Sequence, residues 1–261
     1  MSTRIEQLIK MVRPADRLID VGCDHGLVSL GLARRSDIGA VLATDISAPS
    51  LAKLRTALES EEEGVRKKVT TAVTDGLTGL PWDRTEAILI AGMGGDLIIR
   101  ILSAKPDLVA GAGQLLLSPH SHADKVRLYL AGLGRPIRDE ALVYEEGHYY
   151  EILDVGAGDG EAFFSPENYD PWTAYFGIPL LKRKDPILRD RIGWEIVQRR
   201  SVLDKWSPEA VSPEAKARRA SLEREAEELQ ALRDKYFSAE EKGAGDPALS
   251  DTDRDGSDRI N

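Results

Sequence analysis

Two apolar segments of this chain each end abruptly in glycine. Residues 87–90 lead into Ala-Gly-Met-Gly-Gly at positions 91–95, and residues 19–21 lead into Gly-Cys-Asp-His-Gly at positions 22–26. A helix-like pattern follows each of them. Strand, glycine turn and helix in that order form a crevice at the carboxyl edge of a parallel sheet, where glycine lets a flat ligand approach the backbone. The chain is therefore predicted to bind a ligand between two strand ends.

Strand-like and helix-like segments alternate over the first half of the chain. After a short helix at 3–12, strands are predicted at 18–21, 40–44, 69–73, 87–90 and 114–117, with helices at 27–35, 48–60, 96–102 and 123–133. Short apolar runs separated by helices are typical of parallel strands that are covered on both faces.

The alternation stops after residue 135. Two strand-like segments, 136–144 and 149–155, are separated by only four residues. So short a link cannot cross over to a parallel neighbour, so the two must form an antiparallel hairpin. A doubly wound, Rossmann-like α/β sheet closed by a hairpin resembles the S-adenosylmethionine-dependent methyltransferases, whereas nicotinamide-binding domains generally continue with parallel units. By this fold-level analogy we assign residues 1–160 to an S-adenosylmethionine-binding methyltransferase domain.

The rest of the chain has a different composition. An aromatic, proline-rich connector is followed by two helical stretches, 187–206 and 212–237, whose spaced apolar positions predict a coiled-coil-like helical hairpin. We assign residues 161–238 to this helical appendage. Residues 239–261 are acidic and nearly free of apolar side chains, which predicts a disordered tail.

A second glycine motif lies at residues 152–160. It matches the pattern Asp-x-Gly-x-Gly-x-Gly better than the first site does, but Phe-Phe-Ser-Pro follows it shortly after instead of a helix. Without a strand, turn and helix in sequence the motif has no cradle for a ligand. We interpret it as the end of the last strand.

The overall composition narrows the class of protein. A single cysteine and the lack of a long apolar run predict a cytoplasmic chain without disulfides. The net charge of −9 argues against wholesale nucleic-acid binding. Residues 182–219, however, hold 11 basic and 6 acidic side chains, a sum of +5. This basic segment could contact phosphates or could be an ordinary solvated helix surface.

Acidic residues follow the first three predicted strands. Asp20 and Asp24 flank Gly22 and can bind an ammonium group, although Asp24 could instead cap the next helix. Asp45 can accept hydrogen bonds from ribose hydroxyls, as such an acid does in both NAD sites and methyltransferases. The Asp75-Gly76 pair fits a turn that recognises adenine, and it is equally compatible with a plain type I turn.

The loop at 91–95 lies where amine methyltransferases place residues against the target base. Its glycines and Met93 present backbone groups and a flexible apolar face. Such a surface suits a ring nitrogen that has no hydrogen to lose. His120-x-His122 is weak evidence for a metal, and no cysteine cluster accompanies it, so no metal site is predicted.

The first site, the loop at 91–95 and the segment Tyr-Tyr-Glu-Ile at 149–152 together resemble the bacterial TrmK family of tRNA (adenine-22 N1)-methyltransferases. The family's Asp-Ile-Gly-Ser-Asp-His-Ala turn corresponds to residues 20–26, and its Asp-Gly-Leu corresponds to 75–77. Arg4-Ile5 resembles its N-terminal Arg-Leu, and residues 176–181 resemble its entry to a C-terminal helical domain. Two positions depart from the family: Leu27 replaces a tyrosine, and Ser118-Pro119-His120 replaces Gln-Pro-Asn.

The resemblance implies methyl transfer from S-adenosyl-L-methionine to N1 of an adenine in tRNA, and we expect the protein to be a monomer. The residues assigned to the cofactor are Arg4, Asp20, Gly22, Asp24, His25, Gly26, Asp45, Ile46, Asp75, Gly76, Ala91, Gly92, Met93 and Gly94. Asp24, Met93 and Pro119 are assigned to the target base. The residues assigned to RNA are Lys182, Arg183, Lys184, Arg189, Arg191, Arg199, Arg200, Arg218 and Arg219. Two alternatives stay open: a nicotinamide-dependent oxidoreductase, and a non-catalytic scaffold that binds nucleosides or RNA.

Overall fold

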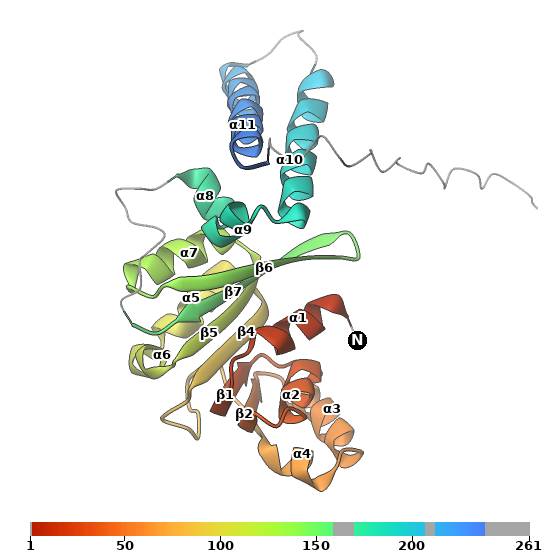
Figure 1. Cartoon of the computed structure of the whole chain (residues 1–261), viewed down its shortest axis with the longest axis vertical. Helices are drawn as coiled ribbons and strands as arrows, with labels where there is room; N and C mark the ends of the chain where they lie inside the picture. The colour runs from red at the N-terminus through yellow and green to blue at the C-terminus, as the bar shows by residue number, and fades with distance from the viewer. Residues whose placement is uncertain (1, 159–169, 207–211, 238–261) are drawn as a thin grey trace, which may run out of the picture.

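The computed structural model describes residues 2–158, 170–206 and 212–237. Their strands form a seven-stranded sheet in the order β3-β2-β1-β4-β5-β7-β6 (Figure 1). The strands are β1 Ala15–Val21, β2 Ile38–Asp45, β3 Val69–Val73, β4 Ala87–Gly94, β5 Gln114–Ser121, β6 Ile137–Glu145 and β7 His148–Gly156. The first five run parallel, and β7 pairs antiparallel with both β5 and β6. The predicted doubly wound sheet with a closing hairpin is confirmed.

The helices cover both faces of this sheet, except for the last two, which extend away from it (Figure 1). They are α1 Thr3–Met11, α2 Leu27–Ala33, α3 Ala48–Glu59, α4 Glu63–Lys68, α5 Gly95–Ser103, α6 Pro106–Gly111, α7 Ala123–Gly132, α8 Pro171–Phe176, α9 Ile178–Arg183, α10 Pro186–Asp204 and α11 Pro213–Phe237. Within the described ranges, no helix is long and apolar enough to cross a membrane.

Alternate residues of the strands pack into two separate hydrophobic cores. Ile19 packs in the core that includes α5, α6 and α7, whereas its neighbour Leu18 packs in the core beneath α1 and α2. Both side chains are fully buried. Apolar side chains on both faces are what the short hydrophobic runs of the sequence predict for parallel strands.

The closing hairpin turns more tightly than the sequence predicted. β6 and β7 extend to Glu145 and His148, so only Glu146 and Gly147 form the turn, with φ of +50° and +79°. Two successive positive φ values are the signature of a type I′ turn, whose twist matches that of the flanking strands. β7 ends at Gly156, which confirms that the second glycine motif contains the end of the last strand; its residues 159 and 160 lie outside the described residues.

The segment interpreted as a connector contains two short helices, α8 and α9, which the sequence analysis did not predict. Prolines stand in the first turns of α8, α9 and α10, where the missing N–H costs nothing. Asp170 and Asp185 cap α8 and α10 by accepting hydrogen bonds from backbone N–H groups of the first turn. These prolines therefore begin helices instead of breaking them.

The C-terminal helices are anchored to the hairpin. Leu142 of β6 packs in one buried cluster with Phe176, Leu180 and Leu188. From there α10 and α11 run side by side away from the sheet (Figure 1). The predicted helices at 187–206 and 212–237 correspond to these two. The predicted boundary at residue 160 and the predicted tail at 239–261 lie outside the described residues.

Candidate active site

A cavity of about 580 Å³ opens at the carboxyl ends of β1, β2, β3 and β4. Its size falls within the range of about 300–1,000 Å³ that is usual for small-molecule sites. Twelve of the fourteen residues that the sequence assigned to the cofactor line it. They are Arg4, Asp20, Gly22, Asp24, His25, Asp45, Ile46, Asp75, Gly76, Ala91, Gly92 and Met93. The structure thus brings together residues from α1 and from four different strand ends.

The turn after β1 owes its shape to glycine. Gly22 has φ of +69°, and its N–H donates to the carbonyl of Thr44 at 2.8 Å, which ties the turn to β2. A Cβ at Gly22 would overlap the end of the Met93 side chain. Glycine at this position therefore lets Met93 reach across from β4, and the two residues form one wall of the cavity.

Gly26 and Gly94, the two remaining assigned residues, do not line the cavity. A Cβ at Gly26 would overlap Leu54 of α3, so this glycine allows close packing between the first turn and that helix. Gly94 ends β4, where a Cβ would lie 3.2 Å from Ser121 Oγ. Both glycines allow close packing behind the wall of the cavity. Their contact with a cofactor stays a prediction.

Asp20 is the buried acid of the site. Its side chain accepts a 2.5 Å hydrogen bond from Ser29 Oγ, and the residue is only 3% exposed. Burial and, to a smaller extent, the nearby Asp45 raise the pKa of Asp20 to about 6, against the opposing effect of the Ser29 hydrogen bond. No cationic side chain in the described part of the chain pairs with this carboxylate, so it can bind a cationic group of a ligand.

Asp45 holds the turns after β1 and β2 in place. Its Oδ2 accepts a hydrogen bond from the Asp24 N–H at 3.1 Å, and its Oδ1 accepts one from the Ser47 N–H at 2.7 Å. The exposed Ile46 lies beside it at the cavity. Asp45 therefore combines a place at the cavity with a structural role.

The Asp75-Gly76 pair follows β3 as predicted. Gly76 has φ of +61° and lies against Ile101, whose side chain also lines the cavity. The Asp75 carbonyl accepts a hydrogen bond from the Thr78 N–H at 3.2 Å. A turn is thus present and faces the cavity, but the positive φ of Gly76 at its second residue excludes a plain type I turn.

Asp24 does not cap the following helix. The N-cap of α2 is Gly26, and no side chain bonds to that helix end. Asp24 adopts a left-handed φ of +48°, and its side chain is 70% exposed and lies 3.5 Å from His25 Nε2. A non-glycine residue in this conformation is strained, as is common where a side chain serves a ligand.

The glycines of the loop after β4 have different structural roles. Gly92, with φ of +81°, exposes backbone at the cavity, and Met93 lies half-buried next to it. Gly95 cannot carry a side chain, because a Cβ there would lie 2.5 Å from the carbonyl oxygen of His122. Pro119 pairs with Met93 in the sheet but is buried and does not line the cavity. A contact between Pro119 and a base stays a prediction.

The structure adds cavity residues that the sequence analysis did not assign. His120 of β5 and Arg100 of α5 line the cavity, as does Leu27 at the position of the family's tyrosine. Tyr150 of β7 lies close by, with the Arg4 guanidinium 4.6 Å from the centre of its ring. The departure at 118–120 from the family's motif was the one sequence signal that pointed to His120.

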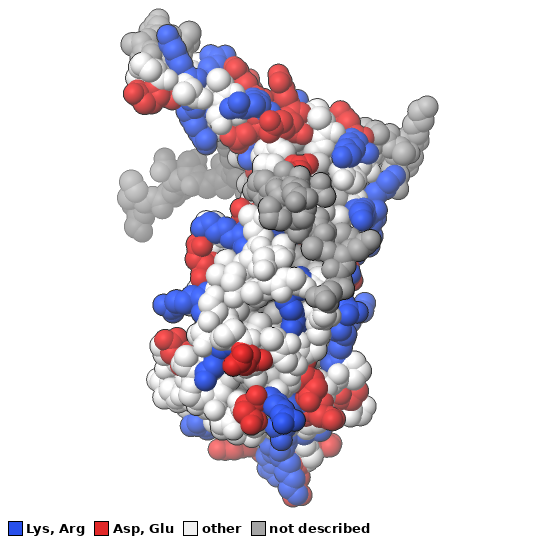
Figure 2. All heavy atoms as spheres, turned by 90° about the vertical axis from the view of Figure 1, so that its left-hand side faces the viewer, with Lys and Arg blue, Asp and Glu red and all other residues white. Residues whose placement is uncertain are grey.

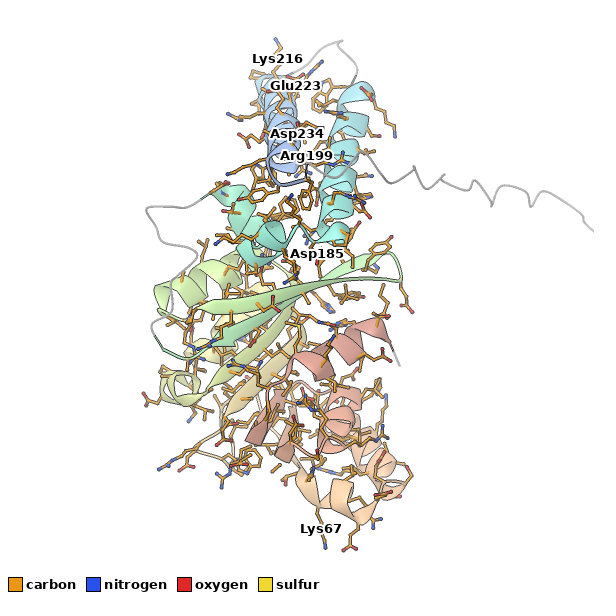
Figure 3. All side chains as sticks on the ribbon, viewed as in Figure 1. Lys67, Asp185, Arg199, Lys216, Glu223 and Asp234 are labelled. Atoms are coloured by element: carbon orange, nitrogen blue, oxygen red, sulfur yellow. The ribbon has the colours of Figure 1, made fainter. Side chains whose placement is uncertain are left out.

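Two of the nine basic residues assigned to RNA are engaged inside the protein. Arg191 is 9% exposed and donates to Glu151 at 2.7 Å. Arg199 bonds to Glu195 and Glu225 between α10 and α11, where Figure 3 labels it. Neither guanidinium is free to contact a phosphate, because each already has carboxylate partners.

The other assigned cations are exposed or half-buried and mostly lie near acids. Arg183 donates to Asp139, Arg189 lies 3.3 Å from Asp190, and Arg219 bonds to Glu223. Figure 2 accordingly shows basic and acidic side chains intermixed over the helical part at the top of the view. This surface is mixed in sign, although residues 182–219 carry a sum of +5.

Comparison with known proteins identifies relatives of this chain. The family model described as "Methyltransferase domain" matches residues 1–153. The tRNA (adenine(22)-N(1))-methyltransferase of Bacillus subtilis (strain 168) is 27% identical over 223 residues, which cover 85% of this chain and 92% of that protein. A crystal structure of the B. subtilis M1A22 tRNA methyltransferase TrmK has a TM-score of 0.75 at 25% identity, covering 90% of this chain and 99% of that one.

A further solved structure is that of a candidate tRNA (m1A22) methyltransferase from Streptococcus pneumoniae in complex with S-adenosyl-L-methionine. It has a TM-score of 0.74 at 26% identity and covers 89% of this chain and 99% of that chain. These relatives confirm the resemblance to the TrmK family that the motifs indicated. With more than half of its length matched by the family model, the chain belongs to the methyltransferase-domain family.

Proposed function

We propose that this protein transfers a methyl group from S-adenosylmethionine to N1 of an adenine in tRNA, at the position equivalent to adenine 22. The observation that carries the proposal is one cavity that joins acids at the ends of β1, β2 and β3 with the glycine loop of β4. The name of the B. subtilis relative supports the choice of substrate. We further propose that the protein acts in the cytoplasm as a monomer and without a metal.

The residues present fit S-adenosylmethionine. Asp20, a buried carboxylate without a cation, suits the ammonium group of the amino-acid moiety. Asp45 and Asp75 line the cavity at the ends of neighbouring strands and suit the ribose hydroxyls and the adenine amine. When bound, this cofactor supplies a methyl group activated by a sulfonium.

The protein's contribution to the reaction is positioning. Adenine N1 has a free lone pair at neutral pH, so no strong general base is needed, and rate comes from holding the nucleophile about 3–3.5 Å from its target in line. Asp24 holds the exocyclic amine or balances the positive charge that the adenine acquires. Met93 packs against the base. A paired or stacked adenine must first be extruded from the RNA to reach the cavity.

Transfer of labelled methyl groups to bulk tRNA, followed by nucleoside analysis, tests the proposal. We expect label in 1-methyladenosine, and binding of S-adenosylmethionine in preference to NAD. Asp24→Ala should slow turnover at saturating cofactor. Label in another nucleoside, or none at all, would reject the proposed activity, and unchanged turnover of Asp24→Ala would remove that residue's role.

We propose that tRNA is held by the exposed cations of the helical part, with Arg191 and Arg199 maintaining the structure. Arg200 is exposed, and among the residues that the structure describes its one polar contact is with Gln230 at 3.5 Å. Arg200→Gln should weaken tRNA binding and flatten its dependence on salt, because one phosphate contact is lost. The neighbouring Arg199 is the matched control. Because its guanidinium is bonded to carboxylates, Arg199→Gln should lower the stability of the protein. Equal tRNA affinity of Arg200→Gln and the parent protein over a salt series would contradict the assignment.

A further inference from the structure

The two ends of the cavity serve different molecules if the proposed function holds. In the sheet order, β2 and β3 lie on one side of β1, and β4 and β5 lie on the other. Asp45 and Asp75, which suit the nucleoside of the cofactor, belong to the first side. The methyl acceptor must therefore enter at the second side, where α1, β4 and β5 supply the lining.

His120 is the aromatic side chain that lines this second end. It lies near the end of β5 and remains exposed at the cavity. Gly92 separates it from Arg4: a Cβ at Gly92 would lie 3.9 Å from His120 Nε2 and 3.5 Å from Arg4 Nη2. The bare backbone of the β4 loop and the imidazole thus form two adjoining walls.

The His120 ring is held in place from outside the cavity. Tyr150 of β7 makes a T-shaped contact with it, with ring centres 5.7 Å apart. Tyr150 itself contacts the Arg4 guanidinium, 4.6 Å from its ring centre, and the ring of His148, whose centre is 6.4 Å away. T-shaped aromatic pairs and cations over rings are both favourable arrangements. The imidazole therefore presents its exposed surface to a ligand without having to be reordered.

We propose that His120 is the aromatic surface on which the target adenine packs, and that Tyr150 is the positioning residue that orients it. The inference rests on the proposed function. It also accounts for the chain's departure from its relatives: Leu27 of α2 offers no ring at the family's tyrosine position, and His120 of β5 supplies one.

The charge of the imidazole fits this role. Burial, together with the nearby Arg4 and His148, lowers the pKa of His120. The ring is therefore neutral at neutral pH. An adenine becomes positively charged when its N1 is methylated, and a neutral ring accepts that charge where an imidazolium would repel it. His120 acts by packing and not by proton transfer, because N1 has no proton to lose.

Three variants separate packing from other roles. His120→Ala removes the ring, His120→Phe keeps a ring that cannot transfer protons, and His122→Asn is the control. His122 is exposed, lies outside the cavity and has φ of +54°, which asparagine tolerates. Each variant is assayed for cofactor affinity, for stability, and for single-turnover methylation of unmodified tRNA at saturating cofactor.

We expect His120→Ala to slow single-turnover methylation about tenfold or more, the scale of one lost base–aromatic contact. Its cofactor affinity should stay within twofold of that of the parent protein. Its stability should be unchanged. His120→Phe should recover most of the rate, and His122→Asn should match the parent.

Three results would overturn the inference. They are a parent-like rate for His120→Ala, a rate for His120→Phe as low as that of His120→Ala, and a parallel loss of cofactor affinity. A parent protein that methylates no tRNA adenine at N1 would instead reject the proposed function itself, so the two failures are distinguishable.

Discussion

At the scale of single residues, the raised pKa of Asp20 predicts that cofactor affinity depends on pH. Only the ionised carboxylate attracts the ammonium group of S-adenosylmethionine, and burial raises the pKa of Asp20 to about 6. Cofactor affinity should therefore be constant above pH 7 and fall as the pH drops through 6, by up to tenfold per unit. Isothermal titration calorimetry between pH 5 and 8 measures this directly.

The matched control for this prediction is Asp20→Asn, which keeps the shape and removes the titrating group. Its cofactor affinity should be low at every pH and should lose the step near 6. A step of equal size in Asp20→Asn would assign the pH dependence to another group.

Much of the candidate site could be predicted from residue types alone. Glycines and aspartates at strand ends are local signals, because their conformation and charge are needed where they stand in the chain. His120 and Tyr150 were missed for the opposite reason. They lie thirty residues apart, and only the pairing of β5 with β7 brings their rings together.

At the scale of elements, Gly177 controls the joint between α8 and α9. It has φ of +86°, and a Cβ there would overlap the buried carboxylate of Glu140. Gly177→Ala should lower the free energy of unfolding by about 2 kcal/mol or more, since strain and overlap add. Urea unfolding followed by tryptophan fluorescence provides the measurement.

Gly193 is the matched control for that substitution. It lies within α10, and a Cβ there would meet no other atom within 4 Å. Gly193→Ala should raise the free energy of unfolding by about 0.4–1 kcal/mol, because alanine restricts the unfolded chain and favours a helix. If both variants changed stability alike, the overlap at Gly177 would not be the cause.

The elements themselves differed in how far sequence could predict them. Every strand was predicted, because hydrophobic runs of period and length typical of buried strands are strong signals. α8 and α9 were missed because six-residue helices carry less than two turns of pattern, and their prolines were interpreted as breaks. The capping aspartates before α8 and α10 were the signals that could have identified helix starts.

At the scale of the whole molecule, four buried charges join the sheet to the helices. Arg127 of α7 bonds to Glu140 and Glu151 at 2.6 Å each, and Arg191 of α10 bonds to Glu151 at 2.7 Å. Glu151→Gln removes the carboxylate of Arg191 and leaves Arg127 with Glu140 alone, so that one buried positive charge is uncompensated. The free energy of unfolding should fall by about 3–5 kcal/mol. Glu223→Gln, in an exposed pair with Arg219, should change it by about 0.5 kcal/mol or less.

The same carboxylate predicts how the protein responds to acid. Burial alone would raise the pKa of Glu151, but Arg191 and Arg127 together lower it. Its contribution to stability is therefore complete above the ordinary glutamic acid pKa of 4.5 and is lost as the pH falls below that value. Urea midpoints of Glu151→Gln and the parent should converge in acid; a constant difference down to pH 3 would contradict this.

Strand β7 belongs to two neighbourhoods at once. Tyr150 packs toward α1 and His120, whereas Tyr149 and Glu151, on either side of it, face α10. Insertion of one residue into this strand would turn each set of side chains toward the opposite face. The packing on both faces would then be disrupted. We therefore expect the helices and the sheet to melt in a single transition, so that neither could be shed as an independent module.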